Sequence, residues 1–253
     1  MTGISISIGP ALAAVLLALL LVAAVAVGFG ELGSWRAVLV AGLRAAGQLA
    51  AVSLVIVAIL RSGWWTAAFV LLMFGVAVFT SARRVKAKHG GPWVAAAIAA
   101  GVLPVLALVL ASGVVPWQPI AVVPIAGIVI GGAMTATSQA TRRALDELRD
   151  RFGEYEAALA LGFLERPAAL EICRPSAGQA LIPPLDQTRT VGLVTLPGAF
   201  VGMLLGGAGP VQAGVTQLLV LVGLLAAESV AVLVAVHLVA AGRIRAGTPR
   251  DYR

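Results

Sequence analysis

Long runs of apolar residues alternate with short polar stretches along the chain, and this pattern predicts a bundle of membrane-spanning helices. A helix needs about 20 mostly apolar residues to cross a bilayer. Seven segments meet this requirement, at about 8–28, 37–60, 64–82, 93–111, 118–138, 185–206 and 213–241. Tryptophans, which are typical of membrane interfaces, lie at the span ends at Trp35, Trp64, Trp65, Trp93 and Trp117. We therefore predict an all-α polytopic membrane protein whose single transmembrane domain covers residues 1–253.

Composition supports this class of protein. Of the 253 residues, 60% are hydrophobic and only 11% are charged, whereas soluble domains carry about 25% charged residues. The mean hydropathy is +1.01. The net charge of +7 comes from basic residues in short loops between apolar runs, where they set membrane topology. We expect the lipid bilayer as a partner and no binding to nucleic acid.

The basic residues gather in alternate loops. They follow the third, fifth and seventh spans, at Arg83, Arg84, Lys86, Lys88, Arg142, Arg143, Arg149, Arg151, Arg243, Arg245, Arg250 and Arg253. The loops at 112–117 and 206–212 carry no charge, and Arg61 is the one basic residue on the opposite side. Because cytoplasmic loops are enriched in Lys and Arg, we expect a cell-membrane protein with its N-terminus outside and its C-terminus in the cytoplasm. No Lys or Arg precedes the first apolar run, so we expect a retained helix rather than a cleaved signal.

One long polar segment, residues 139–184, separates the fifth and sixth spans. Charges at i,i+4 spacing, such as Arg142 and Asp146, predict that the fifth helix continues into water as far as about residue 152. A short second helix is expected over about 154–162. Gly162 would end it and Pro167 would begin another.

This polar segment carries a spaced motif. Glu156, Ala157, Ala158, Gly162, Ile172 and Pro175 fit the pattern E-A-A-x3-G-x9-I-x-x-P. The pattern resembles the cytoplasmic loop by which the permeases of ABC transporters bind their ATPase subunits. The resemblance implies that these six residues couple the membrane domain to an ATPase. The alternative interpretation is an amphipathic connector with accidental spacing, since Glu and Ala are common in helices.

Polar side chains inside the apolar spans are candidates for a translocation path or gate, because charge is costly in a bilayer. Arg44 and Gln48 share one face of the second span, and Glu228 lies in the middle of the seventh. A polar cluster begins the sixth span at Asp186, Gln187 and Arg189, in which the first and last residues are spaced to pair. The structural alternatives are that Arg44 reaches the lipid headgroups, that Glu228 is a protonated packing residue, and that Asp186 and Arg189 form an interfacial ion pair.

The middle of the sixth span adds Thr195, Pro197 and Gly198 to the candidate path. Proline removes a backbone donor from a helix, and lipid tolerates such a break only beside protein or a wet cavity. Gly198, Gly202 and Gly206 repeat every four residues. They would form a smooth face for helix packing or for a dimer seam.

Motifs for catalysis or cofactor binding are missing from the sequence. The P-loop pattern G-x-x-x-x-G-K-[ST] does not occur, so this chain would not bind ATP in that way. No metal site can be identified in the sequence, because it has only two histidines, the single Cys173 and no H-E-x-x-H motif. We expect no enzyme activity and no cofactor on this chain, with ATP–Mg bound by a separate P-loop ATPase.

The sixth span carries the most specific resemblance. Thr190-Val-Gly-Leu-Val-Thr-Leu-Pro-Gly198, continued to Pro210 and Gln217, is similar to V-G-L-V-S-L-P-G-M-M-T-G in the permease of the iron-export ABC transporter family, whose plant relatives are the aluminium-sensitivity permeases. Residues 44–49, 73–84 and 132–134 support the match. The resemblance implies a permease that works as a pair with two ATPase chains and exports a metal ion, such as iron, or another small solute.

The sequence departs from this family after the Pro-Gly pair. Ala199-Phe200-Val201 stand where the family has Met-Met-Thr, and thioethers can ligate soft metals. An ABC permease is therefore implied more firmly than iron as its cargo, and some relatives are linked to nucleotide-sugar export. Rival interpretations are an ion-coupled secondary transporter that uses Arg44 and Glu228, a membrane enzyme that acts on lipid, and a scaffold subunit that does not transport.

Overall fold

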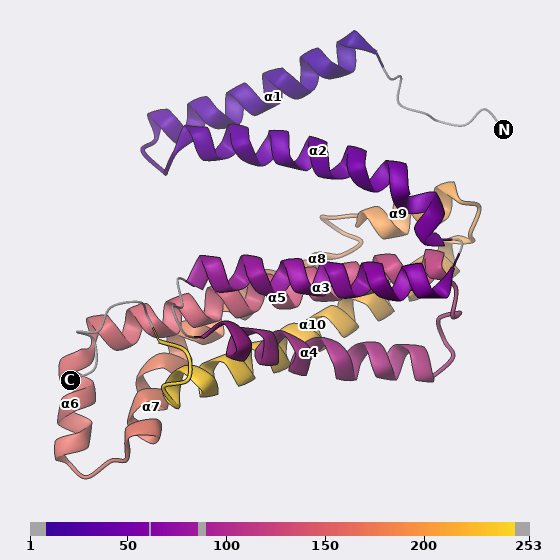
Figure 1. Ribbon diagram of the computed structural model, residues 1–253. Coiled ribbons are helices and arrows are strands. Elements are labelled where there is room, and N and C mark those ends of the chain that lie inside the picture. The colour runs from indigo at the N-terminus through magenta and orange to yellow at the C-terminus, as the bar shows by residue number, and fades with distance from the viewer. Residues whose placement is uncertain (1–8, 61, 86–89, 246–253) are drawn as a thin grey trace. The chain divides into compact units, whose positions relative to one another are not determined.

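The computed structural model describes residues 9–60, 62–85 and 90–245 (Figure 1). These residues are helical apart from connecting turns, and they form two compact units that divide after residue 61. The prediction of an all-α polytopic membrane protein is confirmed. Five residues used in the charge analysis lie outside the described residues, namely Arg61, Lys86, Lys88, Arg250 and Arg253.

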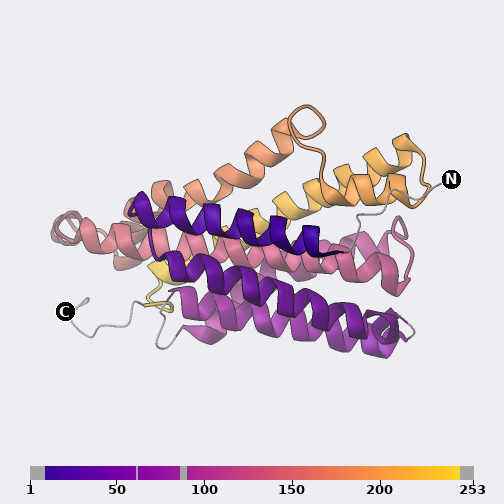
Figure 2. The same ribbon diagram turned by 90° about the horizontal axis from the view of Figure 1, so that it is seen from above.

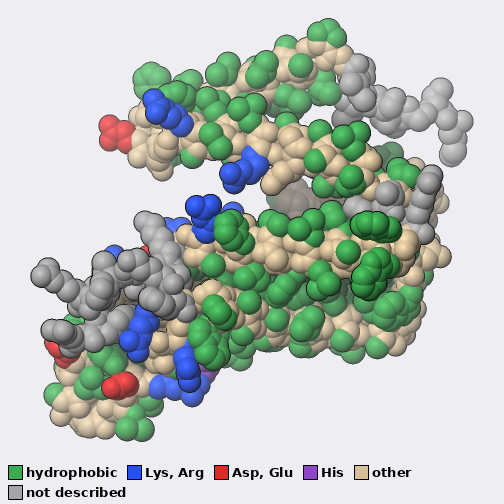
Figure 3. Space-filling view, viewed as in Figure 1, with side chains coloured by type: hydrophobic (Ala, Val, Ile, Leu, Met, Phe, Trp, Pro, Cys, Tyr) green, Lys and Arg blue, Asp and Glu red, His purple; other side chains and the backbone are tan. Residues whose placement is uncertain are grey.

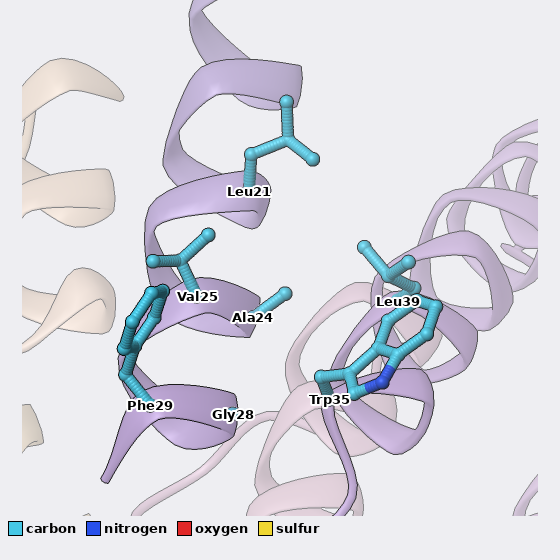
Figure 4. Close-up of a pocket in the computed structure, with 7 residues that line it drawn as sticks. All are labelled: Leu21, Ala24, Val25, Gly28, Phe29, Trp35 and Leu39. Carbon is cyan, nitrogen blue, oxygen red and sulfur yellow. The ribbon is translucent and has the colours of Figure 1, made fainter.

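The first unit is a helical hairpin of α1 (Pro10–Phe29) and α2 (Trp35–Leu60). The two helices approach closely at Gly42, where an added Cβ would lie 2.7 Å from Cδ1 of Leu20. Near the turn they enclose an apolar cavity of about 440 Å³ (Figure 4), lined by Leu21, Ala24, Val25, Gly28, Phe29, Trp35 and Leu39. Most apolar side chains of this unit are exposed within it, as expected of helices that face lipid.

The second unit is a bundle of long helices with shorter ones at one end. In chain order its elements are α3 (Gly63–Val85), α4 (Gly91–Ala111), α5 (Pro119–Asp150), α6 (Phe152–Ala160), α7 (Glu165–Gly178), the 3-10 turn η1 (Gln179–Leu181), α8 (Ile182–Thr190), α9 (Gly198–Leu205) and α10 (Pro210–Ala240). Helix α10 packs against α4 and α5, and α3 packs against α5 (Figures 1 and 2). Within the described residues, α1 to α5 and α10 are long and apolar enough to span a membrane.

Small residues let α4, α5 and α10 approach one another. The buried alanines of these helices include Ala97, Ala126, Ala133, Ala227 and Ala231. A Cβ added at Gly101 would lie 2.2 Å from the backbone oxygen of Ala227, so α4 and α10 meet almost backbone to backbone. Close packing of small residues stabilises helix association in lipid, where the hydrophobic effect between helices is weak.

Charged side chains gather at one end of the second unit (Figure 3). Arg149 pairs with Asp146 at 3.6 Å near the end of α5. After α10, the guanidinium carbon of Arg243 lies 4.9 Å from the ring centroid of Trp93 in the first turn of α4. The start of α4 and the ends of α5 and α10 therefore share one side, which we call the charged end.

The prediction of one continuous span over 185–206 is wrong. A turn at 191–197 separates α8 from α9. In this turn Gly192 has φ +82°, and its N–H donates to the carbonyl of Thr195 at 2.9 Å. Glycine adopts positive φ without strain, and a proline disfavours helix in the residue before it. Pro197 is therefore the N-terminal cap of α9, rather than a break inside a helix as predicted.

The broken segment still returns the chain along the bundle. Helices α5 and α10 run in the same direction, since both end at the charged end beside α7 (Figure 1). Helix α9 packs against α10 and leads directly into its N-terminus. The chain must therefore cross back between α5 and α10, and α8, the turn at 191–197 and α9 make that crossing.

Candidate functional site

Helices α6 and α7 form a hairpin at the charged end. Helix α5 continues to Asp150, close to the end predicted at about residue 152, and α6 begins at Phe152, two residues before the expected start. Gly162 has φ +93°, which favours glycine, and it turns the chain just after α6. Pro167 lies in the first turn of α7, close to the predicted helix start.

The two helices of the hairpin differ in burial. Helix α6 has no buried residue; Glu156 and Ala157 are exposed and Ala158 is half-buried. Ile172 belongs to the buried core shared with α5 and α10, whereas Pro175 is exposed. Of the six predicted coupling residues, four therefore lie on α6 and its turn, Ile172 anchors α7 in the core, and Pro175 lies exposed on α7.

The tip of the hairpin exposes large apolar side chains. Leu161 is 81% exposed, Phe163 55% and Leu164 76%. At the base of α6, Arg151 donates from Nε to Oε1 of Glu154 at 2.8 Å, and this hydrogen bond lowers the pKa of the Glu154 carboxyl. Such exposed apolar groups outside the spanning helices form a candidate interaction surface. The ion pair at the base helps to fix the first turn of α6.

A polar cavity of about 120 Å³ lies where α5, η1, α8 and α10 meet. We call it the inner cavity. Its polar lining residues are Thr135, Gln139, Gln187 and Glu228, and the others are Ala136, Ala180, Pro183 and Pro184. The structure thus brings together two of the predicted path residues, Gln187 and Glu228.

Glu228 is the most buried acidic residue of the described chain. It is 6% exposed, and its Oε2 has no hydrogen-bond partner within the described residues. A Cβ added at Gly132 would lie 2.6 Å from Oε1 of Glu228 and 2.3 Å from Cδ1 of Leu224, so the glycine leaves the space that the carboxyl occupies. An ionised carboxyl at such a buried and unpaired position is costly, and a role for Glu228 in the translocation path stays a prediction.

The remaining polar candidates lie outside the inner cavity or in the other unit. Arg189 and Asp186 pair at 3.7 Å, as predicted, on the exposed side of α8. An exposed pair of this kind contributes little to stability, in keeping with the interfacial alternative. Arg44 and Gln48 lie on α2 of the first unit, and both are exposed within it.

A second cavity, of about 260 Å³, lies where the broken segment meets α10, and we call it the outer cavity. Its lining is mostly apolar and includes Pro197 and Phe200. Gln217 also lines it, is buried, and has an Oε1 without a partner in the described part of the chain. Thr195 and Gly198 lie beside this cavity in the same segment.

The glycine face predicted for the sixth span is open within one chain. A Cβ added at Gly198 or Gly202 would meet no atom within 4 Å, whereas at Gly206 it would meet the backbone oxygen of Gly202 at 3.3 Å. Within the described residues of the second unit, the first two glycines are therefore not needed for packing. Their role in a dimer seam stays a prediction.

Comparison with known proteins decides the family. The model of the uncharacterised protein family UPF0014 matches residues 11–242. The chain belongs to UPF0014. The resemblance inferred from the Leu-Pro-Gly block is thereby confirmed, because the relatives of this chain include both a bacterial protein named a probable iron export permease and a plant protein named ALUMINUM SENSITIVE 3.

Three UPF0014 relatives illustrate the match. The UPF0014 membrane protein STAR2 of Oryza sativa subsp. japonica is 35% identical over 219 residues, which cover 85% of this chain and 77% of the relative. Protein ALUMINUM SENSITIVE 3 of Arabidopsis thaliana is 35% identical over 179 residues, covering 70% and 65%. The probable iron export permease protein FetB of Escherichia coli (strain K12) is 33% identical over 146 residues, covering 58% and 56%. No solved structure matches the chain.

Two polar residues of the UPF0014 inner cavity, Thr135 and Gln139, were not among the predicted path residues. They lie four residues apart on one face of α5, where the apolar run gives way to polar residues. Thr137 and Thr141 repeat this spacing on the roughly opposite face of α5, and both hydroxyls are buried without a partner in the described residues. The i,i+4 spacing was the available signal, but hydroxyl and amide groups at a helix end are too common to single out.

Proposed function

We propose that this UPF0014 chain is the transmembrane permease subunit of a two-component ABC transporter that exports a metal ion or another small solute. The observation that carries the proposal is the α6–α7 hairpin, which presents an exposed helix and an apolar tip at the charged end. A similar protein, FetB, is named a probable iron export permease protein, which supports the permease class and a metal as cargo. The second subunit would be a cytoplasmic P-loop ATPase that carries ATP–Mg.

The hairpin has the properties of an ATPase dock. Glu156 is exposed on α6 and can pair with a basic residue of the partner, while Leu161 and Phe163 offer apolar contact beside it. Because Ile172 and its neighbours bury α7 against α5 and α10, a force applied to α6 acts on a segment that is packed into the bundle. A partner groove that closes on ATP binding could therefore move the hairpin as one body.

A continuous helical connection leads from this dock to the inner cavity. The chain from Glu165 to Thr190 passes through α7, η1 and α8 without a non-helical residue (Figure 1). Arg143 of α5 donates a hydrogen bond to Gln179 in η1. Gln187, near the end of the run, lines the inner cavity. A displacement of the hairpin can thus reach the cavity before it meets the non-helical turn at 191–197.

The orientation and assembly follow from the same features. We propose that the charged end faces the cytoplasm of a cell membrane and that the N-terminus lies outside, because Lys and Arg mark cytoplasmic loops. The broken segment would supply the sixth of the seven crossings that this topology requires. Two copies would pair, and the uncovered face at Gly198 and Gly202 is the candidate seam.

The test of the dock is a pull-down with a candidate P-loop ATPase from the same organism. Glu156→Lys combined with Gly162→Leu reverses a charge on α6 and strains the turn that follows it. Glu171→Lys is the matched control, since it makes the same charge change at an exposed position of α7. We expect the double variant to lose the ATPase while the control and the wild-type chain retain it. Equal binding by all three would leave the hairpin an ordinary connector.

The inner cavity also favours a second candidate, an ion-coupled secondary transporter. Glu228 is buried beside polar groups of α5 and α8, as a coupling carboxylate would be. Transport in sealed vesicles distinguishes the two candidates. Uptake that needs the ATPase and ATP supports the first, and uptake driven by an ion gradient without any ATPase supports the second.

A further inference from the structure

The inner cavity differs in chemistry from two other cavities of the described chain. The cavity of the first unit and the outer cavity are lined mainly by hydrocarbon. In the inner cavity Thr135, Gln139 and Gln187 bring a hydroxyl and two amides, and Glu228 brings a carboxyl. The Thr135 hydroxyl donates to the carbonyl of Gly131 at 3.0 Å, which leaves its oxygen able to accept. Every one of these groups can supply an oxygen ligand.

Charge balance indicates what this cavity would hold. Glu228 is the one ionisable group among its lining residues, and no Lys, Arg or His is among them. Its Oε2 is buried and has no partner in the described residues. An ionised carboxylate at this depth requires a compensating positive charge. The described protein does not provide one, and a bound cation would.

The volume of the cavity limits the size of the ligand. A water molecule takes up about 30 Å³ of liquid, so a cavity of about 120 Å³ has room for roughly four waters. A cation that keeps part of its hydration shell fits this space. Organic ligands of drug size occupy pockets of about 300–1,000 Å³, so a nucleotide sugar does not fit the inner cavity in this conformation.

The donor atoms limit the kind of cation. Oxygen donors without thiolate, imidazole or thioether suit hard cations. In the described residues no three His, Cys, Asp or Glu side chains gather as metal ligands, so neutral amide and hydroxyl oxygens would complete the coordination around one carboxylate. We propose that the inner cavity binds one small hard cation, with Glu228 as its charged ligand and Thr135, Gln139 and Gln187 as its neutral ligands.

This site deepens the proposed function by naming the class of cargo, and it rests on that function for transport only. Gln187 is exposed as well as lining the cavity, so the cation has a route to the cavity from the surface of α8. Binding itself needs neither ATP nor a partner subunit. A failure of the hairpin to bind an ATPase would therefore leave the site intact, and a failure of cation binding would leave the dock intact.

The test uses the purified full-length chain in lipid nanodiscs, without ATPase and with Mn²⁺ as the probe. Free Mn²⁺ is followed by electron paramagnetic resonance during titration of the wild-type chain, Glu228→Gln and Gln187→Leu. Glu171→Gln is the matched control, because it removes an exposed carboxylate from α7. Excess Mg²⁺, another hard cation, is added at the end of each titration as a competitor.

We expect saturable binding of Mn²⁺ to the wild-type chain and its displacement by Mg²⁺. Glu228→Gln should weaken binding by about tenfold or more, Gln187→Leu should weaken it less, and Glu171→Gln should leave it unchanged. Because Gln has nearly the shape of Glu, the variant should fold, and an unchanged thermal midpoint verifies this. Equal binding by the wild-type chain and Glu228→Gln, or no saturable binding by the wild-type chain, would overturn the proposal.

Discussion

Replacing Gly101 by alanine sets the intrinsic preference of a helix against the packing of this bundle. In a helix interior alanine is favoured over glycine by about 1 kcal/mol, so propensity alone predicts a gain in stability. The new Cβ would, however, lie 2.2 Å from the backbone oxygen of Ala227 and 3.0 Å from the Cβ of Ala231. A backbone oxygen cannot rotate away, so α4 would have to move away from α10.

The size of this effect follows from the contact. Overpacking a filled core costs about 1–3 kcal/mol, and a backbone obstacle places Gly101→Ala towards the upper end of that range. After the gain of about 1 kcal/mol from propensity, we expect a net loss of about 1–2 kcal/mol in the free energy of unfolding. The loss should be accompanied by weaker packing along the whole α4–α10 contact, because both helices are rigid.

The matched control is Gly131→Ala on α5, where an added Cβ would meet no atom within 4 Å. This variant should be as stable as the wild-type chain or up to about 1 kcal/mol more stable. Both variants can be unfolded by SDS in the same mild detergent, with unfolding followed by the reaction of Cys173, which is fully buried in the native chain. If Gly101→Ala were as stable as Gly131→Ala, the close α4–α10 contact and the reasoning built on it would be refuted.

Three further predictions concern the cavity, the hairpin and their connection. Gly132→Ala places a Cβ 2.3 Å from Cδ1 of Leu224 and 2.6 Å from Oε1 of Glu228. Both side chains can rotate away, so the free energy of unfolding should change little, whereas displacement of the carboxyl should lower the Mn²⁺ affinity about tenfold. Burial raises the pKa of the Cys173 thiol from 9.0 to about 11, so between these pH values the thiol ionises only in the unfolded chain. The free energy of unfolding should therefore fall as the pH rises through this window. An equal fall in Cys173→Ala would contradict the assignment of this pH dependence to Cys173. Inserting two glycines between Gly178 and Gln179 would interrupt the helical connection between the hairpin and the inner cavity. The variant should still bind the ATPase in pull-downs but should not transport in vesicles, and transport at the wild-type rate would contradict a rigid connection between the two.

The long helices could be predicted from the sequence because each is set by a local property, the length of an apolar run. The span expected at 93–111 is α4, Gly91–Ala111. The span expected at 185–206 failed because hydropathy does not record backbone conformation. Gly192 and Pro197 lie in a stretch as apolar as a spanning helix, yet a positive φ at the glycine and the restriction that the proline places on the residue before it end one helix and start another.

The candidate site was only half predictable for a related reason. Gln187 and Glu228 could be singled out because each is polar within an apolar run. That they share one cavity depends on how α8 packs against α5 and α10, which no local pattern records. Gly132 illustrates the limit, since its role becomes visible only when the carboxyl of Glu228 is found in the space that a Cβ would fill.

The break between α8 and α9 lies at a place in the chain where it would affect how a movement of the hairpin is transmitted. Helices α4, α5 and α10 meet through buried small residues, so they cannot slide past one another without losing that contact. The run from Glu165 to Thr190, in contrast, is packed at the hairpin and ends in a turn. Hydrogen bonds within this turn satisfy part of its backbone. For example, the N–H of Val194 donates to the carbonyl of Thr190 at 3.0 Å. If an ATPase moves α6, the displacement must appear at Gln187 or be absorbed at 191–197. The inner cavity lies at the first of these places and the outer cavity at the second, so one moving segment would reach both.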